Sequence, residues 1–421
     1  MAEIEYDYLD LKYKPKNDVI CLFRIEPKKG MTLKKAAETV ALESSTGTWV
    51  AIPGKEYVEK LNAKVFSIKG KFVKIAYPMG LFEKGNAPNI LSSIAGNIFG
   101  MKAVKNLRLE DVSFPKKLVK SFPGPYYGIK GIRKLMKIKD RPFLGTIIKP
   151  KLGLNVGDHV KSAYDSWIGG CDFVKDDENL ASQDFNKFER RLTKTLEAKD
   201  KAESETGEKK AYLINVTAET NEMVRRAELV RQQGGKFIMV DIITAGFASL
   251  QTLRNANLKL AIHAHRAMHA AMTRNEKHGI RMIVIADFAR LIGVDSLHIG
   301  TGIGKLEGKI KNIVELEEEI EKARVEETNL RLKQNWYGKK AVLGVCSGGL
   351  HPGYVPYLVR HLGKDILIQM GGGIHGNKLG SKIGARAARQ AIDAVMKGIS
   401  LKEYANNHFE LKETLKQFAK K

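Results

Sequence analysis

The residues with the clearest chemical potential in this sequence form a Lys-Asp-Asp-Glu run at the end of an apolar segment. On an extended chain, Lys175 and Asp177 point to the same side, and Glu178 follows directly. Mg²⁺ prefers carboxylate oxygens and binds through few of them, which keeps positions for a substrate. A protonated lysine repels a metal, but a lysine carbamylated by CO₂ is an anionic oxygen ligand. The run therefore allows a magnesium site, and an acidic turn with one salt bridge is the simpler alternative.

Two lysines follow another apolar segment. Lys149 and Lys151 are two positions apart, so they share one face of an extended chain. Two ammonium groups held close together lower each other's pKa, which suits one of them for proton transfer near neutral pH. Two solvated surface lysines are the alternative interpretation.

A histidine pair and an arginine end a third apolar segment. His263 and His265 share a strand face, and Arg266 offers a two-pronged donor for a phosphate. The pair could instead bind zinc, but the sequence nearby offers no third soft ligand. His265 is therefore a candidate for proton handling and Arg266 for phosphate binding.

Glycine clusters follow three further apolar segments. HIGTGIGK (298–305) reads as a loop that can close on a ligand and deliver the cation of Lys305. SGG (347–349) and GGG (371–373) expose backbone N–H groups that suit a phosphate. If the chain forms an eight-stranded α/β barrel, these are the loops after its seventh and eighth strands, which often bind a phosphate. Each cluster alone is compatible with an ordinary tight turn. Together with the acidic run, they favour metal-assisted chemistry on a bisphosphorylated, enolisable sugar.

These groups need a scaffold that brings successive strand ends together. From about residue 140, short apolar segments alternate with helical ones, and eight strands are expected at 143–150, 171–177, 211–218, 237–243, 258–266, 295–301, 341–349 and 366–373. This rhythm predicts a (β/α)₈ TIM barrel, in which catalytic groups sit at the carboxyl ends of the strands. A doubly wound open sheet is the alternative, although no glycine-rich turn marks a dinucleotide site.

The first part of the chain lacks strict alternation. A strand is expected at 18–27, a helix at 31–43, a strand pair at 65–68 and 72–76, and a helix at 90–100. We therefore expect an α/β protein with two domains: a smaller α+β domain of ferredoxin-like type over residues 1–125, and the barrel with a helical C-terminal tail over residues 126–421.

Composition restricts the remaining possibilities. The net charge of +24, from 71 Lys and Arg against 47 Asp and Glu, is compatible with nucleic-acid binding, with attraction of an anionic substrate, or with a generally lysine-rich surface. The lysines are spread along the chain, which favours the last. The three cysteines form no paired spacing, and no apolar run reaches the ~20 residues that span a bilayer. We therefore expect a cytoplasmic protein without disulfides, nucleic acid or membrane as partners.

Several of these segments, in order and spacing, resemble the large subunit of ribulose-1,5-bisphosphate carboxylase/oxygenase (RuBisCO). They are GTIIKPKLGL (145–154), GGCDFVKDDEN (169–179), HAHRAMHA (263–270), HIGTGIGKLEG (298–308), SGGLHP (347–352) and QMGGG (369–373), with ESSTGTW (43–49) and SSIAGNIFG (92–100) near the N-terminus. The pattern is most similar to the archaeal form III branch. The resemblance covers nearly the whole chain.

The resemblance implies a carboxylase, with O₂ as a competing substrate in an oxygenase (monooxygenase) side reaction. It implies that Asp177, Glu178 and a carbamate on Lys175 hold Mg²⁺. It also implies that this carbamate, or a group beside it, removes the carbon-3 proton of ribulose 1,5-bisphosphate. It further implies that Lys305 holds the new carboxylate and that Lys149, tuned by Lys151, protonates the product carbanion. His265 would take part in proton handling, and two molecules of 3-phosphoglycerate would result.

Substrate binding is likewise implied at two phosphate sites. The first would consist of Arg266, His298 and Ser347, and the second of Thr48, Trp49, Lys305, Gly349, Gly371 and Gly372. Gly348 and Gln369, within the same motifs, complete the expected substrate-binding set. Glu43 and Asn97 match residues that in this family come from a neighbouring subunit. The resemblance therefore implies a homodimer or a higher homo-oligomer of dimers, without a small subunit.

Two departures from plant-type sequences stand at Ile147 and Gly302, and the extra glycine should loosen the closing loop. We therefore expect weaker discrimination of CO₂ from O₂. By family implication, the substrate derives from AMP and nucleotide salvage. The alternative is a RuBisCO-like enolase or isomerase of another sugar phosphate, but such proteins usually lose the loop lysine, which is present here. A non-catalytic nucleic-acid-binding protein is the alternative from another class.

Overall fold

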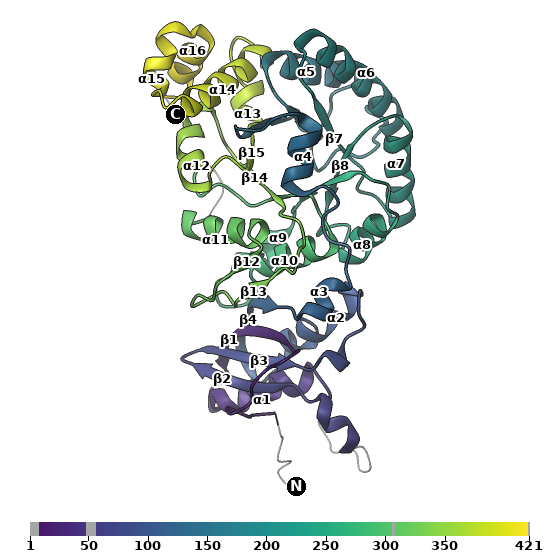
Figure 1. Ribbon diagram of the computed structural model, residues 1–421, viewed down its shortest axis with the longest axis vertical. Coiled ribbons are helices and arrows are strands. Elements are labelled where there is room, and N and C mark those ends of the chain that lie inside the picture. Colours follow the sequence, from purple (N-terminus) through teal and green to yellow (C-terminus); the bar gives the residue numbers. More distant parts are fainter. Residues whose placement is uncertain (1–7, 48–55, 305–307, 420–421) are drawn as a thin grey trace. The chain divides into compact units, whose positions relative to one another are not determined.

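The computed structural model describes residues 8–47, 56–304 and 308–419 (Figure 1). Their contacts divide into two compact units. The N-terminal unit contains the described residues up to Pro123, together with 268–292 and 322–339. The barrel unit contains 124–267, the described residues of 293–321, and 340–419. Each unit has its own sheet.

The N-terminal unit is built on a five-stranded sheet in the order β10-β4-β1-β3-β2. The strands are β1 (Val19–Pro27), β2 (Lys64–Lys69), β3 (Phe72–Tyr77), β4 (Val104–Ser113) and β10 (Gly279–Ile280). All neighbours are antiparallel except β10, which runs parallel to β4. The strand at 18–27, which is the central strand β1, and the pair around 69–71 were predicted, whereas strand β4 beside β1 was not.

The described helices of this unit are α1 (Leu33–Glu43), α2 (Ala87–Ile94), α3 (Lys116–Lys120), α9 (His269–Thr273) and α10 (Met282–Ile292), and a small hairpin joins β12 (Arg324–Val325) to β13 (Gln334–Asn335). The predicted helix at 90–100 is wrong in its extent. The α-helix ends at Ile94, and 97–100 form a 3₁₀ turn. Gly96 causes the break, because the chain turns so tightly there that a β-carbon would lie 2.1 Å from the Ser92 carbonyl oxygen.

The barrel unit contains a closed parallel barrel in the order β11-β14-β15-β5-β6-β7-β8-β9, which excludes the open-sheet alternative. The strands are β5 (Phe143–Ile147), β6 (Phe173–Lys175), β7 (Ala211–Asn215), β8 (Phe237–Asp241), β9 (Ala261–His265), β11 (Ser296–His298), β14 (Leu343–Ser347) and β15 (Ile366–Gln369). All eight predicted strands exist. They end earlier than the sequence indicated, so several candidate site residues lie in loops.

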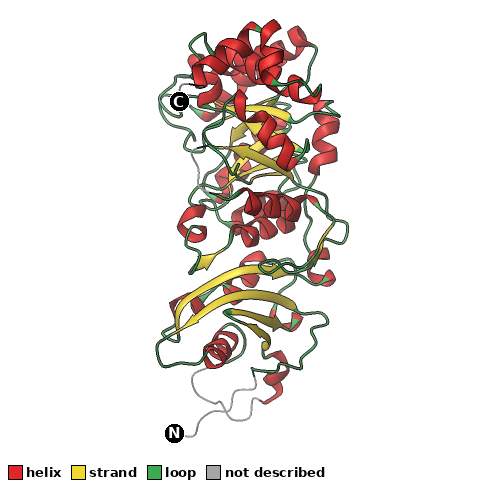
Figure 2. Ribbon diagram, turned by 90° about the vertical axis from the view of Figure 1, so that its left-hand side faces the viewer, coloured by secondary structure: helices red, strands yellow, loops and turns green. Residues whose placement is uncertain are grey.

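Helices surround these strands in Figure 2, where strands are yellow and helices red. They are α5 (Val156–Gly169), α6 (Phe188–Thr206), α7 (Thr220–Gln232), α8 (Phe247–Asn255), α11 (Ile310–Glu321), α12 (Val355–Leu362), α13 (Gly372–His375) and α14 (Ser381–Met396). The predicted helical tail consists of α15 (Leu401–Tyr404) and α16 (Phe409–Phe418), and α16 packs on α14. No described helix is long and apolar enough to cross a membrane.

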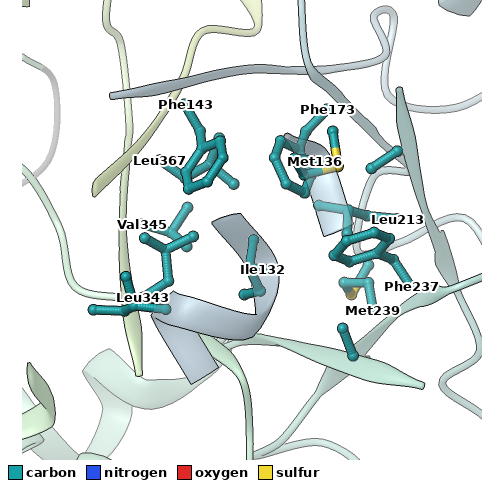
Figure 3. Close-up of a cluster of buried hydrophobic side chains, with 13 residues drawn as sticks. Ile132, Met136, Phe143, Phe173, Leu213, Phe237, Met239, Leu343, Val345 and Leu367 are labelled. Atoms are coloured by element: carbon teal, nitrogen blue, oxygen red, sulfur yellow. The ribbon is translucent and has the colours of Figure 1, made fainter. Parts of the chain in front are cut away.

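A short helix that the sequence analysis missed, α4 (Gly128–Met136), closes the end of the barrel where the strands begin. Its Ile132 and Met136 lie among side chains from the first residues of the strands (Figure 3). Phe173 meets Phe143 and Phe237 edge to face, with ring centroids 5.5 and 5.4 Å apart. The amino-terminal end of the barrel is therefore a packed core, which leaves the carboxyl end for chemistry.

Candidate active site

Lys175 is the last residue of β6, and its side chain is fully buried. Its Nζ donates a hydrogen bond of 2.7 Å to the Asp176 carbonyl oxygen and lies 3.4 Å from a carboxylate oxygen of Glu178. Burial lowers the pKa of Lys175, although the neighbouring Glu178 and Asp177 oppose this shift. The same ion pair acts on Glu178: burial alone would raise its pKa, but Lys175 and other positive groups nearby hold it at about 2.

The next residue, Asp176, points away from this cluster, as the alternation of an extended chain predicted. Its carboxylate is buried and accepts hydrogen bonds from Arg191 Nε (3.1 Å), the Tyr212 hydroxyl (2.6 Å) and the Asn215 backbone N–H (3.0 Å). His159 Nε2 lies 3.3 Å from the same carboxylate. The pKa of Asp176 is held far below its usual range, because the Arg191 cation and these donors outweigh burial.

The same donors fix the loop that carries Glu178. Asn215 donates its side-chain amide to the carbonyl oxygens of Glu178 (3.0 Å) and Leu180 (2.9 Å). Arg191 donates to the carbonyl oxygen of Ala181 at 2.7 Å. The direction of Asp176 and the path of the following loop are therefore set together, and both place Asp177 and Glu178 beside Lys175.

The two candidate lysines after β5 separate in the structure. Lys149 Nζ donates to Asp177 Oδ2 at 2.6 Å, whereas Lys151 is exposed and donates to Asn179 at 3.3 Å. Strand β5 ends at Ile147, so strand alternation does not govern their directions. Gly371 makes room for Lys149, because a β-carbon there would lie 3.1 Å from Lys149 Cε.

His265, at the end of β9, lies between two carboxylates. Its Nε2 is 3.6 Å from Glu178 and its Nδ1 is 3.7 Å from Asp241 Oδ1. Asp241 ends β8 and is buried, and its Oδ1 accepts no hydrogen bond within the described residues. A buried carboxylate oxygen without a donor favours a cation or a proton donor nearby.

Two buried histidines and two serines form a continuous hydrogen-bonded chain across β9, β11 and β14. Ser296 Oγ lies 2.9 Å from His263 Nδ1, the Nε2 atoms of His263 and His298 are 2.9 Å apart, and His298 Nδ1 lies 2.8 Å from Ser347 Oγ. Burial is the main cause that lowers the pKa of both histidines well below the usual value. Both rings are therefore neutral at neutral pH.

The remaining predicted phosphate ligands lie around the same strand ends. Burial lowers the pKa of Arg266 to about 10, and within the described residues no ion pair joins it to a carboxylate. Its Nη2 fits beside Gly300, where a β-carbon would be 3.0 Å away. Gly348 and Gly349 adopt positive φ values of 122° and 76°, which glycine favours.

The loops after β14 and β15 are neighbours, because Ser347 pairs with Gln369 in the parallel register. The loop that contains the substrate-binding candidates Gly371 and Gly372 therefore follows the strand next to the one that leads to Gly348 and Gly349. Gln369 is fully buried, and neither atom of its amide has a hydrogen-bond partner among the described residues. The carboxyl end of the barrel thus contains unmatched polar groups, as expected where a polar ligand binds.

These residues fit a magnesium ion if one more anionic donor is present. Asp177 and Glu178 supply two hard oxygen donors beside Lys175. The described residues contain no group of three or more His, Cys, Asp or Glu side chains that could hold a metal ion. A metal at this position therefore needs a further anionic donor, and a carbamate on Lys175 would supply one.

The N-terminal candidates are partly described. Glu43 and Asn97 come together in the N-terminal unit, where Asn97 Nδ2 donates to Glu43 Oε1 at 3.4 Å. Thr48, Trp49 and Lys305 lie outside the described residues.

Sequence reasoning missed four residues of the site: Asp241, Asn215, Arg191 and Ser296. Asp241 and Asn215 carried a usable signal, since each is a polar residue near the carboxyl end of a predicted strand and ends the observed one. Arg191 carried none, because a charged residue early in a helix normally reads as solvent-exposed. Ser296 begins a strand on the interior side of the barrel, and a small polar residue there gives no signal by itself.

Comparison with known proteins agrees with this geometry. The family described as "Ribulose bisphosphate carboxylase large chain, catalytic domain" matches residues 128–418, and the corresponding N-terminal domain family matches residues 7–118. The ribulose bisphosphate carboxylase of Methanocaldococcus jannaschii is 48% identical over 97% of this chain and 99% of its own length. That of Methanosarcina mazei is also 48% identical, over 99% of both chains.

Solved structures give the same result. The dimeric archaeal Rubisco from Hyperthermus butylicus superposes with a TM-score of 0.93 at 48% identity, covering 98% of each chain. An octameric Rubisco from Pyrococcus horikoshii, solved with sulfate ion, superposes with a TM-score of 0.91 at 44% identity, over 98% of this chain and 96% of that one. The matches span both units and every described site motif, and the chain therefore belongs to the ribulose bisphosphate carboxylase large-chain family.

Proposed function

We propose that this chain is a magnesium-dependent ribulose-1,5-bisphosphate carboxylase, with O₂ as a competing substrate. The observation that carries the proposal is the buried amine of Lys175 beside the carboxylates of Asp177 and Glu178. Only an unprotonated amine adds CO₂, and burial shifts Lys175 towards that form. The family relationship and the names of the relatives support the same activity.

Asp177, Glu178 and the carbamate formed on Lys175 would hold the metal. When bound, Mg²⁺ supplies Lewis-acid stabilisation of the negative charge that develops on the substrate oxygens. The chain's own contribution is to keep the two carboxylates in place through Asp176 and its donors, and to keep water from the amine by burial.

Proton handling falls to Lys149 and His265. The Lys149 ammonium is held 2.6 Å from Asp177, so it can donate a proton to a carbanion that forms beside the metal ligands. His265, between Glu178 and Asp241, has carboxylates within 4 Å of both ring nitrogens. Lys151 would act on Lys149 from the exposed rim.

The two phosphates of the substrate would bind at the loops after β9, β11, β14 and β15. Arg266, His298 and Ser347 would hold one, and Gly348, Gly349, Gly371 and Gly372 would offer backbone donors to the other, assisted by Thr48, Trp49 and Lys305. Gln369 would use its unmatched amide near the bound sugar. Lys305 would also hold the carboxylate that CO₂ addition creates.

Glu43 and Asn97 would complete the site of a second subunit, so the working unit would be at least a homodimer without a small subunit. The dimeric and octameric assemblies named for the relatives support a homo-oligomer. As the family resemblance implies, the enzyme would be cytoplasmic and would take its ribulose bisphosphate from nucleotide salvage.

The test is fixation of labelled bicarbonate with ribulose 1,5-bisphosphate, after incubation with Mg²⁺ and CO₂. Wild type is compared with Lys175→Met, Lys305→Ala and the control Lys210→Met. Lys210 is also a buried lysine of the barrel unit, but it pairs with Glu208 and the Cys171 carbonyl oxygen instead. We expect acid-stable label in 3-phosphoglycerate for wild type and Lys210→Met, and none for the other two.

Equal fixation by Lys175→Met would overturn the metal-site assignment. Consumption of the sugar bisphosphate by wild type without fixation would favour the enolase or isomerase alternative.

A further inference from the structure

The hydrogen-bonded chain Ser296–His263–His298–Ser347 has an internal direction. Each neutral imidazole carries one N–H, and the two Nε2 atoms face each other at 2.9 Å. One of these two nitrogens must carry a proton and the other must not, since two protons would collide and two lone pairs would repel. The tautomers of His263 and His298 are therefore linked.

Two arrangements satisfy this condition. In the outward arrangement, Ser296 donates to His263 Nδ1, His263 Nε2 donates to His298 Nε2, and His298 Nδ1 donates to Ser347. The hydroxyl hydrogen of Ser347 is then free to point into the site. In the inward arrangement every hydrogen bond is reversed, and the Ser347 hydroxyl donates its only hydrogen to His298 Nδ1.

The surroundings of Ser296 distinguish the two arrangements. Ser296 is only 5% exposed, and His263 is the one hydrogen-bond partner of its hydroxyl within the described residues. In the outward arrangement this hydroxyl donates to His263. In the inward arrangement it accepts, and its own buried hydrogen has no acceptor, which is costly. Ser296 thus favours the outward arrangement.

We propose that Ser296 and His263 are positioning residues that hold Ser347 as a hydrogen-bond donor for a phosphate group of the substrate. Phosphate oxygens at neutral pH mainly accept hydrogen bonds, so they need Ser347 in its donating state. The hydrogen bonds from Ser296 through the two histidines hold Ser347 in its donating state before the substrate binds. Binding then requires no change of the histidine tautomers. The identity of the substrate that carries this phosphate rests on the proposed function, whereas the direction of the hydrogen bonds does not.

The direct test is neutron diffraction from deuterated wild-type crystals without substrate. We expect deuterium on His263 Nε2 and His298 Nδ1. Deuterium on His298 Nε2 instead would overturn the proposal, whether or not the enzyme fixes CO₂.

The functional test measures the dissociation constant of inorganic phosphate by calorimetry, without turnover. Ser347→Ala should weaken phosphate binding about tenfold, the value of one hydrogen bond to a charged group. Ser296→Ala removes the bias between the arrangements, so about half of the molecules are competent and binding weakens about twofold. In the Ser347→Ala background, Ser296→Ala should have no further effect.

Two controls separate this role from a general loss of packing. Ser296→Thr keeps the hydroxyl and should bind phosphate like wild type. Ser166→Ala removes another buried serine hydroxyl of the barrel unit, which donates to the Ser162 carbonyl oxygen, and should also leave phosphate binding unchanged. An equal effect of Ser296→Ala with and without the Ser347 hydroxyl would overturn the coupling. If Ser296→Ala fails to fold, the neutron result on wild type decides.

Discussion

Replacement of Arg191 by Met is the sharpest test of how the fold holds the proposed metal ligands. Arg191 is fully buried and donates to the Asp176 carboxylate and to the backbone carbonyl oxygens of Asn186 and Ala181. Its removal leaves a buried carboxylate without its cation, which costs about 3–5 kcal/mol of unfolding free energy. We expect a loss of this size at pH 7, measured by guanidinium unfolding.

The pH dependence of this loss follows from the pKa of Asp176. That pKa is depressed in the folded protein, so the ion pair contributes stability above the unfolded pKa of about 3.9 and loses it as the pH falls. The difference between wild type and Arg191→Met should therefore be largest near neutral pH and should narrow below about pH 4. In the double variant Asp176→Asn/Arg191→Met no buried charge remains, so much of the stability should return.

The same variant should affect activation by Mg²⁺. Arg191 and Asp176 fix the loop that carries Glu178, so the Mg²⁺ concentration for half-activation should rise more than the KM for ribulose bisphosphate. Arg254→Met is the matched control, because it breaks another buried ion pair of the barrel unit, with Asp295. It should lose comparable stability with unchanged Mg²⁺ dependence. A cost below about 1 kcal/mol for Arg191→Met, or additive effects in the double variant, would refute the reasoning.

Four further predictions concern individual residues and the discrimination between the two gases. Ile132→Ala, in the core at the closed end of the barrel, should lower the unfolding free energy by about 2–5 kcal/mol without changing KM, as measured by denaturant unfolding and kinetics. Gly371→Ala places a β-carbon 3.1 Å from Lys149 Cε, so kcat should fall while half-activation by Mg²⁺ changes little. Gly302 has φ +63°, and a β-carbon there would lie 2.8 Å from Ile310 Cα. Gly302→Val should therefore strain the loop and lower both carboxylation and the melting temperature. Wild type should discriminate CO₂ from O₂ less than plant-type enzymes in a competition assay.

The barrel could be predicted from the sequence because its strands are short apolar segments at regular spacing, and because six of them are followed by charged or glycine-rich residues that suit one reaction on a phosphorylated substrate. Strand β4 escaped prediction for the opposite reason. Its sequence VKNLRLEDVS (104–113) contains charged residues along its length, yet it lies inside the N-terminal sheet, between β10 and the central strand β1. Glu110 and Asp111 are buried there, and such burial depends on partners that lie elsewhere in the chain.

The candidate site divides in the same way. Lys175, Asp177 and Glu178 are adjacent in sequence, so their chemistry could be inferred from one short run. Strand alternation also predicted that the intervening Asp176 points away. What it points to could not be predicted, because Arg191 and Tyr212 reach it from a helix and from another strand.

Local sequence thus specifies which groups can react, whereas residues distant in sequence decide the state in which they are held. Ser296 and Ser347 show this most clearly, since they are joined only through two histidines on neighbouring strands. Neither serine alone indicates a direction for its hydroxyl. The direction arises because the closed barrel places β9, β11 and β14 side by side and buries the far end of the chain of bonds. Closure of the barrel therefore does more than gather the predicted strand ends: it restricts the tautomers available to them.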